Sequence, residues 1–273
     1  MANVQRYLEK AAAALEEMRR QRPLVHNITN FVVMTETANI LLHIGASPVM
    51  AHAPEEVEEL ARAAGALVLN IGTLEKSWID SMLLAGRAAA ENGVPVVLDP
   101  VGAGATRLRT ETSLRILQEV QPTVLRGNAA EVSILAGIEA RVKGVEADGA
   151  IASPAEIARR AAQKFNTTAV VTGPQDAISD GSRVILVNNG HPMLGMLTGT
   201  GCMATALVGA FLAVEKDAVA AALGALVSFG LAAERAALKA SAPASFRVAL
   251  FDEVYLIDPD ALLSDARVEA VSL

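Results

Sequence analysis

Residues 198–202 read Thr198-Gly199-Thr200-Gly201-Cys202, and an apolar pattern of helical spacing follows at once, from Met203 to Val214. Two glycines let the backbone approach a ligand closely and direct successive N–H groups at one point. A helix that begins there adds the positive end of its dipole, so the stretch is suited to hold an anion such as phosphate. Short glycine patterns are also common in ordinary turns. The interpretation therefore depends on the rest of the chain.

Cys202 is the only cysteine in the sequence, and it falls in the first turn of this expected helix. Thiols at helix N-termini usually have a lowered pKa, so we expect a lowered pKa here. A single cysteine also excludes an internal disulfide bond and fits a reducing, cytoplasmic environment.

Upstream of the glycine stretch, short apolar runs alternate with helical patterns. Runs of four to six apolar residues without alternation are typical of strands that are buried on both faces. The expected strands are 23–30 (running into a polar loop), 46–50, 66–71, 95–98, 123–125 (leading into 126–128) and 168–171. The expected helices are 2–20, 31–44, 54–64, 74–92, 110–121, 129–136, one that begins at Ser153, 203–214 and 218–240. This alternation predicts an α/β fold with a mostly parallel central sheet and helices on both faces.

The pattern changes at 177–186, where Asp180-Gly181 separates two strand-like runs. This predicts a hairpin that adds antiparallel strands to one edge of the sheet. No linker, low-complexity segment or long repeat divides the chain, so we expect 1–273 to form a single domain. The charged, glycine-bearing segment 140–149 is expected to be a surface loop.

The composition excludes several classes of protein. The net charge is −7 and aromatic residues make up 3%, which argues against a nucleic-acid-binding surface. No run reaches the roughly 18 uninterrupted apolar residues of a membrane span, and the N-terminus has no apolar signal-peptide core. The long alanine-rich segment 218–240 carries Glu234 and Arg235, so we expect a buried helix of a soluble protein. The charged fraction of only 19% suggests that other subunits cover some apolar surface.

Polar residues end several of the expected strands. In an open parallel sheet, the carboxyl ends of the strands share one edge, and ligands bind there. The residues at these positions are Asn70, Asp99, Arg126, Asn128 and Thr172, with Glu131 three positions beyond Asn128. We therefore expect them to lie along one rim, close to the glycine stretch.

The residue types at this rim suit phosphoryl transfer. Mg²⁺ takes one or two carboxylates together with water and phosphate oxygens, which Asp99 and Glu131 would provide. Arg126 offers a forked donor for phosphate. The N–H groups of the glycine stretch, and Cys202 beside the attacking hydroxyl, complete the set of groups that phosphoryl transfer requires. Each residue also has a structural alternative: Asp99 as a turn former before Pro100, Glu131 as a helix N-terminal charge, and Arg126 as the partner of a surface carboxylate.

The histidines give weaker signals. His26 and His191 are flanked by loop signals, and we expect structural or solvated roles for His43 and His52. Neither pair has the spacing of metal ligands. The sequence also lacks a Walker-type phosphate loop, a protein-kinase signature and a Gly-x-Gly-x-x-Gly after the first strand.

As a set, these residues resemble the ribokinase-like superfamily of small-molecule kinases and, within it, the hydroxyethylthiazole kinase family. The late Gly-x-Gly before a helix, the Asp-Pro strand end and the Asn-x-x-Glu spacing carry the superfamily resemblance. The segments that carry the family resemblance, in chain order, are 23–30 (PLVHNITN), 45–50 (GASPVM), 69–74 (LNIGTL), 98–106 (LDPVGAGAT), 126–131 (RGNAAE) and 199–202 (GTGC).

The resemblance implies a ribokinase-like three-layer fold. It also implies ATP- and Mg²⁺-dependent phosphorylation of the primary alcohol of 4-methyl-5-(2-hydroxyethyl)thiazole, for thiamine synthesis or salvage. The residues implied are Asp99 and Glu131 for Mg²⁺, Arg126, Thr172 and Asn128 for ATP, Asn30, Met50 and Gly199 for the thiazole, and Gly199, Thr200, Gly201 and Cys202 for catalysis. It implies, in addition, a homotrimer with the thiazole site at a subunit boundary.

The superfamily usually has an aspartate base at the position of Cys202, whereas the hydroxyethylthiazole kinases share the cysteine. A loose phosphoryl-transfer transition state asks little of a base, so Cys202 is either a weak base or a residue that positions the alcohol. We do not expect a covalent nucleophile. The alternatives are a hydroxymethylpyrimidine or pyridoxal kinase, an ADP-forming hydrate dehydratase (all of which usually keep the aspartate), a non-catalytic thiazole or nucleotide binder, and a structural protein.

Overall fold

The computed structural model describes residues 2–138 and 152–271, so the expected surface loop at 140–149 lies outside the described residues. The strands are β1 (Leu24–Ile28), β2 (Ser47–Val49), β3 (Ala66–Asn70), β4 (Val96–Asp99), β5 (Val124–Asn128), β6 (Thr168–Thr172), β7 (Asp176–Ser179), β8 (Val184–Val187) and β9 (Val268–Val271). Within the described residues they form one nine-stranded sheet in the order β2-β1-β3-β4-β5-β6-β7-β8-β9. All neighbours from β2 to β6 are parallel, and those from β6 to β9 are antiparallel. The predicted mostly parallel sheet is confirmed.

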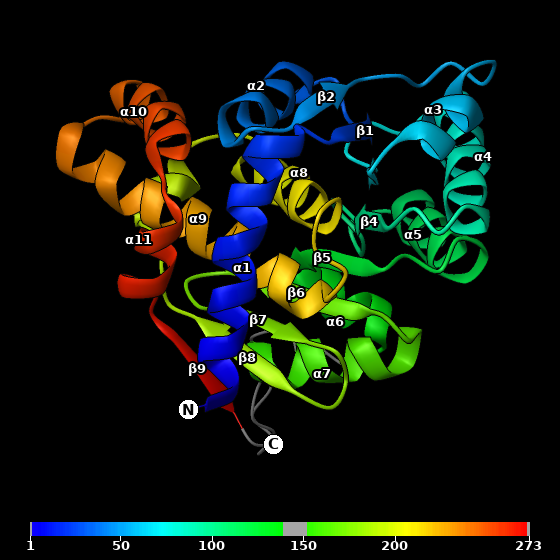
Figure 1. The fold of residues 1–273 in the computed structure, drawn as a ribbon. Coiled ribbons are helices and arrows are strands. Elements are labelled where there is room, and N and C mark those ends of the chain that lie inside the picture. The colour runs from blue at the N-terminus through cyan, green and yellow to red at the C-terminus, as the bar shows by residue number, and fades with distance from the viewer. Residues whose placement is uncertain (1, 139–151, 272–273) are drawn as a thin grey trace.

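Helices cover both faces of the sheet, which gives three layers (Figure 1). The helices are α1 (Ala2–Gln21), α2 (Met34–Ile44), α3 (Val57–Ala63), α4 (Lys76–Glu91), α5 (Arg107–Glu119), α6 (Ala129–Ala136), α7 (Pro154–Phe165), the 3₁₀ helix η1 (Pro192–Met196), α8 (Thr200–Leu212), α9 (Ala218–Lys239), α10 (Pro243–Leu256) and α11 (Pro259–Ser264). One apolar core joins Val68 and Val97 to α1, α2 and α8–α11, and the other joins Leu67 and Leu98 to α3–α7. Alternate residues of the central strands β3 and β4 therefore pack into opposite cores, as a sheet buried on both faces requires.

The predicted hairpin is confirmed as β7 and β8. At its turn, a carboxylate oxygen of Asp180 accepts hydrogen bonds from the N–H groups of Ser182 (3.0 Å) and Arg183 (2.9 Å). The hairpin is not the outermost element, because β9 pairs with β8 and occupies that edge of the sheet. The sequence did not predict β9, since its residues are partly or fully exposed and form no continuous apolar run.

Five helices (α2, α3, α4, α5 and α8) begin two or three residues from the predicted position, and side-chain hydrogen bonds explain the differences at α2 and α5. α2 begins at Met34 rather than at residue 31, because Oδ1 of Asn30 accepts the N–H of Val32 (3.1 Å) and holds a turn. α5 begins at Arg107, three residues earlier than expected, because the Thr106 hydroxyl caps its first turn.

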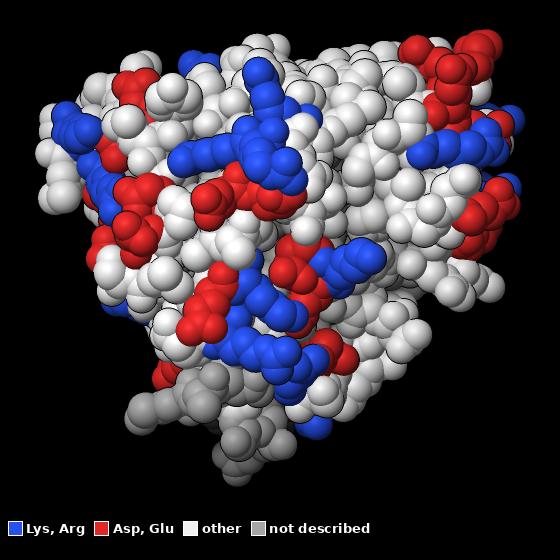
Figure 2. Space-filling view, in the orientation of Figure 1, with Lys and Arg blue, Asp and Glu red and all other residues white. Residues whose placement is uncertain are grey.

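α9 is long and apolar enough to cross a membrane by length and composition alone, but 83% of its most apolar window is buried inside the structure. It packs against α1, α8 and α10. This is the pattern of a core helix, as the sequence predicted. On the molecular face in Figure 2, acidic and basic side chains lie side by side, with wide uncharged areas between the groups.

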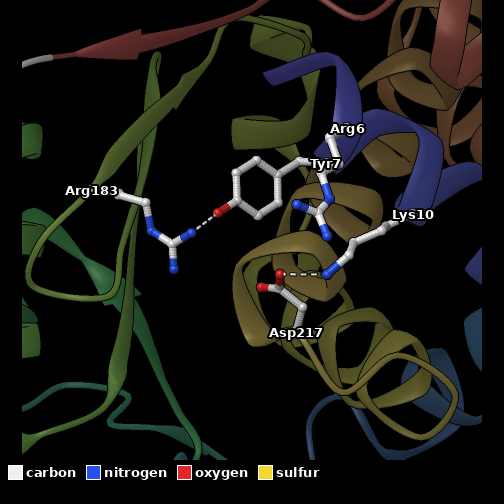
Figure 3. A pocket seen from close by; sticks show the side chains of 5 residues that line it. All are labelled: Arg6, Tyr7, Lys10, Arg183 and Asp217. Atoms are coloured by element: carbon white, nitrogen blue, oxygen red, sulfur yellow. Dashed lines mark hydrogen bonds and ion pairs between the residues drawn. The ribbon is translucent and has the colours of Figure 1, made fainter. Parts of the chain in front are cut away.

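A cavity of about 130 Å³ lies between α1, the start of β8 and the start of α9; Figure 3 shows the five side chains that line it, Arg6, Tyr7, Lys10, Arg183 and Asp217. Its charges are already largely paired: Lys10 Nζ lies 2.7 Å from Asp217 Oδ2, and Arg183 pairs with Asp180. The strand register places Val184 level with the first half of β6, at the end of the sheet opposite the predicted rim. The chemistry of the chain therefore lies elsewhere.

Candidate active site at the carboxyl ends of the strands

Six parallel strands, side by side, each bring a predicted site residue to one edge of the sheet. In spatial order, Met50 follows β2, Asn30 follows β1, Asn70 ends β3, Asp99 ends β4, Arg126 lies in the middle of β5 with Asn128 at its end, and Thr172 ends β6. The helix α8 packs against β1, β3 and β4, and its N-terminus carries the glycine stretch. The expected rim is present, and it spans the point where the strand order reverses between β1 and β3, which is where ligands bind in such sheets.

Asp99 lies at the centre of the rim and is 1% exposed. Its Oδ2 accepts hydrogen bonds from Nδ2 of Asn70 (2.8 Å) and from the Thr205 hydroxyl (2.8 Å), and Nη1 of Arg126 lies 3.8 Å away. Burial raises the pKa of this carboxyl group to about 6, although the charge of Arg126 opposes the shift. Its Oδ1 is buried and has no hydrogen-bond partner among the described residues. The carboxylate therefore keeps one oxygen for a cation or ligand.

Arg126 joins the rim to the glycine stretch. It is 8% exposed, and Nη2 donates a hydrogen bond to the Thr172 hydroxyl. A Cβ atom added to Gly201 would lie 2.8 Å from Nη1 of Arg126, so the glycine allows the guanidinium group to approach the helix start. Asp176 is a further charged neighbour: burial raises its pKa to about 6, while a hydrogen bond from the N–H of Gly173 and the charge of Arg126 oppose the shift.

The glycine stretch forms the N-terminus of α8. Gly199 is the N-cap in the left-handed conformation (φ +90°), and a Cβ atom there would lie 2.6 Å from Cγ1 of Val33. Among the described residues, the backbone N–H groups of Thr200, Gly201 and Cys202 have no hydrogen-bond acceptor. Unpaired N–H groups at a helix N-terminus are a general anion-binding arrangement. The predicted anion-holding geometry is therefore present.

The expectation of a lowered Cys202 pKa is wrong. Burial, and secondarily the charge of Asp99, raise the pKa of the thiol to about 11. Its Sγ lies 3.2 Å from Nδ2 of Asn70 and 3.6 Å from Nδ2 of Asn30, and these amide groups offset the shift only in part. Loss of hydration therefore outweighs the helix dipole, which acts over only the first turn and is modest in size. At neutral pH the thiol is protonated.

Asn30, Asn70 and Asp99 form a continuous chain of hydrogen bonds across β1, β3 and β4. Nδ2 of Asn30 donates to Oδ1 of Asn70 (2.8 Å), which also accepts the N–H of Gly72 (3.0 Å). Nδ2 of Asn70 in turn donates hydrogen bonds to Oδ2 of Asp99 and Sγ of Cys202. Buried networks of this kind fix side-chain orientation, because each member loses a partner if it moves.

Glu131 and Asn128 form a capping box at the start of α6. Oδ1 of Asn128 accepts the N–H of Glu131 (2.9 Å), and Oε2 of Glu131 accepts the N–H of Asn128 (2.9 Å). The remaining oxygen, Oε1, accepts the N–H of Gly102 (2.8 Å). The helix-terminal role that the sequence allowed for Glu131 is therefore real. Its charge also raises the pKa of Asp99, so the two carboxylates interact electrostatically.

The oxygen donors of Asp99 and Glu131 fit Mg²⁺ better than they fit a metal that takes all of its ligands from protein side chains. The described residues contain no group of three or more His, Cys, Asp and Glu side chains that could hold a metal ion. Mg²⁺ retains several waters and binds through one or two carboxylates plus phosphate oxygens. The unpartnered Oδ1 of Asp99 and the spare lone pairs of the Glu131 carboxylate match that requirement.

The histidines have structural positions. His26 lies within β1 and is fully buried; its Nε2 lies 2.8 Å from the carbonyl oxygen of Ala51 and supports the backbone just after Met50. Burial lowers its pKa, so the ring is neutral at pH 7. His191 caps η1, since its Nδ1 accepts the N–H of Met193 (3.2 Å).

The sequence did not predict three residues that support the rim: Thr205, Arg109 and Asp176. Thr205 lies three residues after Cys202 on α8, so helical spacing brings both to one face. Arg109 donates hydrogen bonds to the carbonyl oxygens of Ile71, Gly72 and Val101, which ties two rim loops together. No local pattern distinguishes such residues from surface charges.

Solved structures of two pyridoxal kinases share this fold. The ADP complex of Bacillus subtilis pyridoxal kinase superposes with a TM-score of 0.58 at 18% identity, over 78% of this chain and 91% of that chain. A pyridoxal kinase from Staphylococcus aureus superposes with a TM-score of 0.60 at 16% identity, over 77% and 87%. At these identities the likeness shows the fold alone. The fold and the rim together define an α/β protein of the ribokinase-like fold with a ligand site at the carboxyl ends of its strands.

Closer relatives define the family. A family model described as "Hydroxyethylthiazole kinase family" matches residues 15–260. Hydroxyethylthiazole kinases from Desulforudis audaxviator (55% identity, 98% of each chain) and Chloroflexus aurantiacus (54%, 97% of this chain and 98% of the relative) are similar over nearly their whole length. The solved structure of the hydroxyethylthiazole kinase protein from Pyrococcus horikoshii OT3 superposes with a TM-score of 0.88 at 50% identity, over 96% and 99% of the two chains. The chain belongs to the hydroxyethylthiazole kinase family.

Proposed function

We propose that this chain transfers the γ-phosphoryl group of ATP to the primary alcohol of 4-methyl-5-(2-hydroxyethyl)thiazole, giving the thiazole phosphate and ADP for thiamine synthesis or salvage. The family supplies the reaction. The observation that carries the proposal in this chain is the set of unpaired N–H groups of Thr200, Gly201 and Cys202, next to the Arg126 guanidinium group. A phosphoryl group in transfer needs this kind of fixed positive environment.

Each end of the rim has its own proposed ligand. Arg126, Thr172 and Asn128 bind ATP, and Asp99 with Glu131 would hold Mg²⁺, which neutralises phosphate charge when bound. The buried, unpartnered Oδ1 of Asp99 supports the metal role. The strand order supports the division, because β6 lies on the opposite side of β4 from β1 and β2, whose loops carry two of the proposed thiazole contacts, Asn30 and Met50.

In the proposed reaction, the alcohol oxygen forms a bond to the γ-phosphorus as the bond from that phosphorus to the bridging oxygen of ADP breaks. The alcohol proton leaves late and goes to a phosphoryl oxygen or to water, so no strong base is needed. The N–H groups at the start of α8 hold the phosphoryl oxygens. The protonated Cys202 thiol, fixed by Asn70 and Asn30, orients the alcohol.

Asn30, Met50 and Gly199 are proposed to contact the thiazole. We further propose a homotrimer with this site at a subunit boundary. Large apolar side chains beside the site support that arrangement, because Phe31, Val32 and Met196 are 63%, 64% and 68% exposed in a single chain. Sedimentation should then report three times the 28.4 kDa mass of one chain.

We also propose that residues 1–273 form one domain that acts in the cytoplasm. One sheet runs through the described residues with a core on each face, which supports a single folding unit. The single cysteine supports a reducing environment.

The decisive experiment measures ADP formation by the purified protein with Mg·ATP, in the presence and absence of the thiazole alcohol. Hydroxymethylpyrimidine and pyridoxal serve as competing alcohols, and a chelator removes Mg²⁺. Turnover that requires the thiazole alcohol and Mg²⁺ supports the proposal. Turnover with another alcohol alone would overturn the substrate, and ATP binding without any turnover would favour a nucleotide-binding protein.

A further inference from the structure

Trp78 is the only tryptophan of the chain and lies in the first turn of α4, where it is 2% exposed. Two aromatic rings pack against it. The centroid of the Phe31 ring lies 4.6 Å from that of Trp78 at an interplanar angle of 40°, and the His52 ring lies 4.6 Å away at 46°. These separations fall at the close end of the range for favourable aromatic pairs. A single buried indole therefore holds two rings at once.

The two rings belong to the two loops that carry Asn30 and Met50, two of the three proposed thiazole contacts. Phe31 directly follows Asn30 in the loop after β1, and His52 comes two residues after Met50 in the loop after β2. The pairing of β1 with β2 extends only as far as His26 and Val49, so it ends before these loops begin.

Each loop has one backbone anchor besides Trp78. The N–H of Phe31 donates to the Thr73 hydroxyl (3.1 Å), and the carbonyl oxygen of Ala51 contacts Nε2 of His26 (2.8 Å). The first bond runs to the loop after β3 and the second to the middle of β1, so neither joins the tips of the two loops directly. Trp78 contacts a ring from each of the two loops.

We propose that Trp78 is a positioning residue for the alcohol substrate. By packing on Phe31 and His52 together, it sets the spacing of Asn30 and Met50 and hence the affinity for the heteroaromatic ring. This inference rests on the proposed function. It predicts no effect on ATP, because β5 and β6, which carry Arg126 and Thr172, lie three and four strands away from β1.

The kinetic test compares Trp78→Leu, which removes the aromatic contacts, with Trp78→Phe, which keeps a ring. We expect Trp78→Leu to raise the KM for the thiazole alcohol about tenfold, as loss of aromatic pairing allows, with the KM for ATP unchanged. Trp78→Phe should restore most of the affinity. An unchanged KM for the alcohol, or equal rises for the alcohol and ATP, would overturn the inference.

Met82→Ala is a matched control for general damage to α4. Met82 lies one turn further along the same helix and is fully buried in the core. This variant should lower the thermal midpoint while leaving the KM for the alcohol unchanged. A rise in that KM equal to the rise in Trp78→Leu would mean that any weakening of α4 has the same effect, and would overturn a specific role for Trp78.

Two further variants test whether the loops act through Trp78. Phe31→Leu and His52→Leu should each raise the KM for the alcohol when Trp78 is present. In the Trp78→Leu background, the same changes should add little, because the shared partner is already gone. Fully additive effects would contradict a role that both loops share.

The single tryptophan also provides a readout that needs no turnover. Titration of the wild-type protein with the thiazole alcohol, in the absence of ATP, should change Trp78 emission with a midpoint close to the KM. Mg·ADP alone should leave the emission unchanged. Wild-type protein that turns over the alcohol but shows no emission change and no Trp78→Leu effect would overturn this inference alone, whereas absence of wild-type turnover with the alcohol would overturn the proposed function.

Discussion

The side-chain amide nitrogen of Asn70 lies 2.8 Å from Oδ2 of Asp99, at the ends of two adjacent strands. The same nitrogen lies 3.2 Å from Sγ of Cys202. One amide group thus connects the proposed metal ligand with the proposed alcohol-positioning thiol. Because the hydrogen bond lowers the pKa of Asp99 and partly offsets its burial, Asn70 helps to keep that carboxylate ionised.

Asn70→Ala should move the acid limb of the pH profile of kcat/KM to higher pH by about 1 unit. Loss of a hydrogen bond to a carboxylate is typically worth about 1.5–3 kcal/mol, and one pKa unit corresponds to about 1.4 kcal/mol. Asn92→Ala is the control, since Asn92 donates a comparable bond to the carbonyl oxygen of Ala88 (2.8 Å) at the far end of α4. An acid limb that does not move in Asn70→Ala would contradict this role.

Asp99→Asn should abolish most activity yet make the ligand-free protein more stable at pH 8. The folded-state pKa of about 6 exceeds the ordinary value of 3.8, so the folded protein binds this proton more tightly than the unfolded chain. Stability is therefore lost as the pH rises through 4 to 6, by up to about 3 kcal/mol, and the amide avoids that loss. Asp176 has a similar shift, but it is present in both proteins and cancels in the difference.

Thermal midpoints of the two proteins between pH 4 and pH 8, without Mg²⁺ or nucleotide, measure this effect. The variant should gain at least about 2 °C at pH 8, and the gain should shrink towards pH 4. Mg·ADP should raise the midpoint of the wild type more than that of Asp99→Asn. A variant that is less stable than the wild type at pH 8 would show that the hydrogen bonds and the charge of Arg126 outweigh the cost of burying the Asp99 carboxylate.

The Cys202 thiol should react slowly with iodoacetamide. Only the thiolate reacts, and a pKa of about 11 rather than 9.0 leaves roughly 100-fold less thiolate at pH 8. Protein unfolded in urea should react at the rate of a free cysteine. Rapid labelling of the folded protein would indicate a thiolate, and with it the base role.

Substitution of Cys202 tests its role as a non-covalent residue beside the alcohol. Cys202→Ala should lower kcat roughly 10- to 1000-fold, which overlaps the lower part of the range for loss of a general base. Cys202→Asp should retain activity, because a carboxylate can accept the amide hydrogen bonds that Asn70 and Asn30 now give to sulfur. A Cys202→Asp protein that folds and binds both ligands but has no turnover would falsify this view.

Gly201→Ala should lower kcat about 100-fold with little loss of stability. Its Cβ atom would lie 2.8 Å from Nη1 of Arg126 and displace the guanidinium group from the N–H groups at the start of α8. Loss of one donor of this kind typically lowers kcat by roughly 10²–10³-fold. Gly209→Ala, in the same helix, would instead meet Cγ2 of Val68 at 2.6 Å in the core. That control should lower the thermal midpoint while kcat stays near the wild-type value.

Much of the fold could be read from local sequence, because strands buried on both faces must be apolar and the helices between them follow a fixed period. The strands Ala66–Asn70 and Val96–Asp99 therefore agree with the predicted strands 66–71 and 95–98 to within one residue at each end. The edge strand Val268–Val271 was not predicted, since a partly exposed strand has no continuous apolar run. This strand is held by its pairing with β8.

The candidate site divides in the same way. The residue types at the strand ends, and the rule that parallel strands share one edge, were enough to bring Asp99, Arg126 and Thr172 together. The pKa of Cys202 followed from burial and from the nearby carboxylate, neither of which lies close to it in the chain. The contact of Trp78 with both Phe31 and His52 likewise joins three separate segments. Sequence alone determined which groups are present and on which edge of the sheet they lie, because strand and helix patterns are local. Only the tertiary structure decided the protonation and spacing of these groups, because desolvation and packing depend on residues brought together from across the chain.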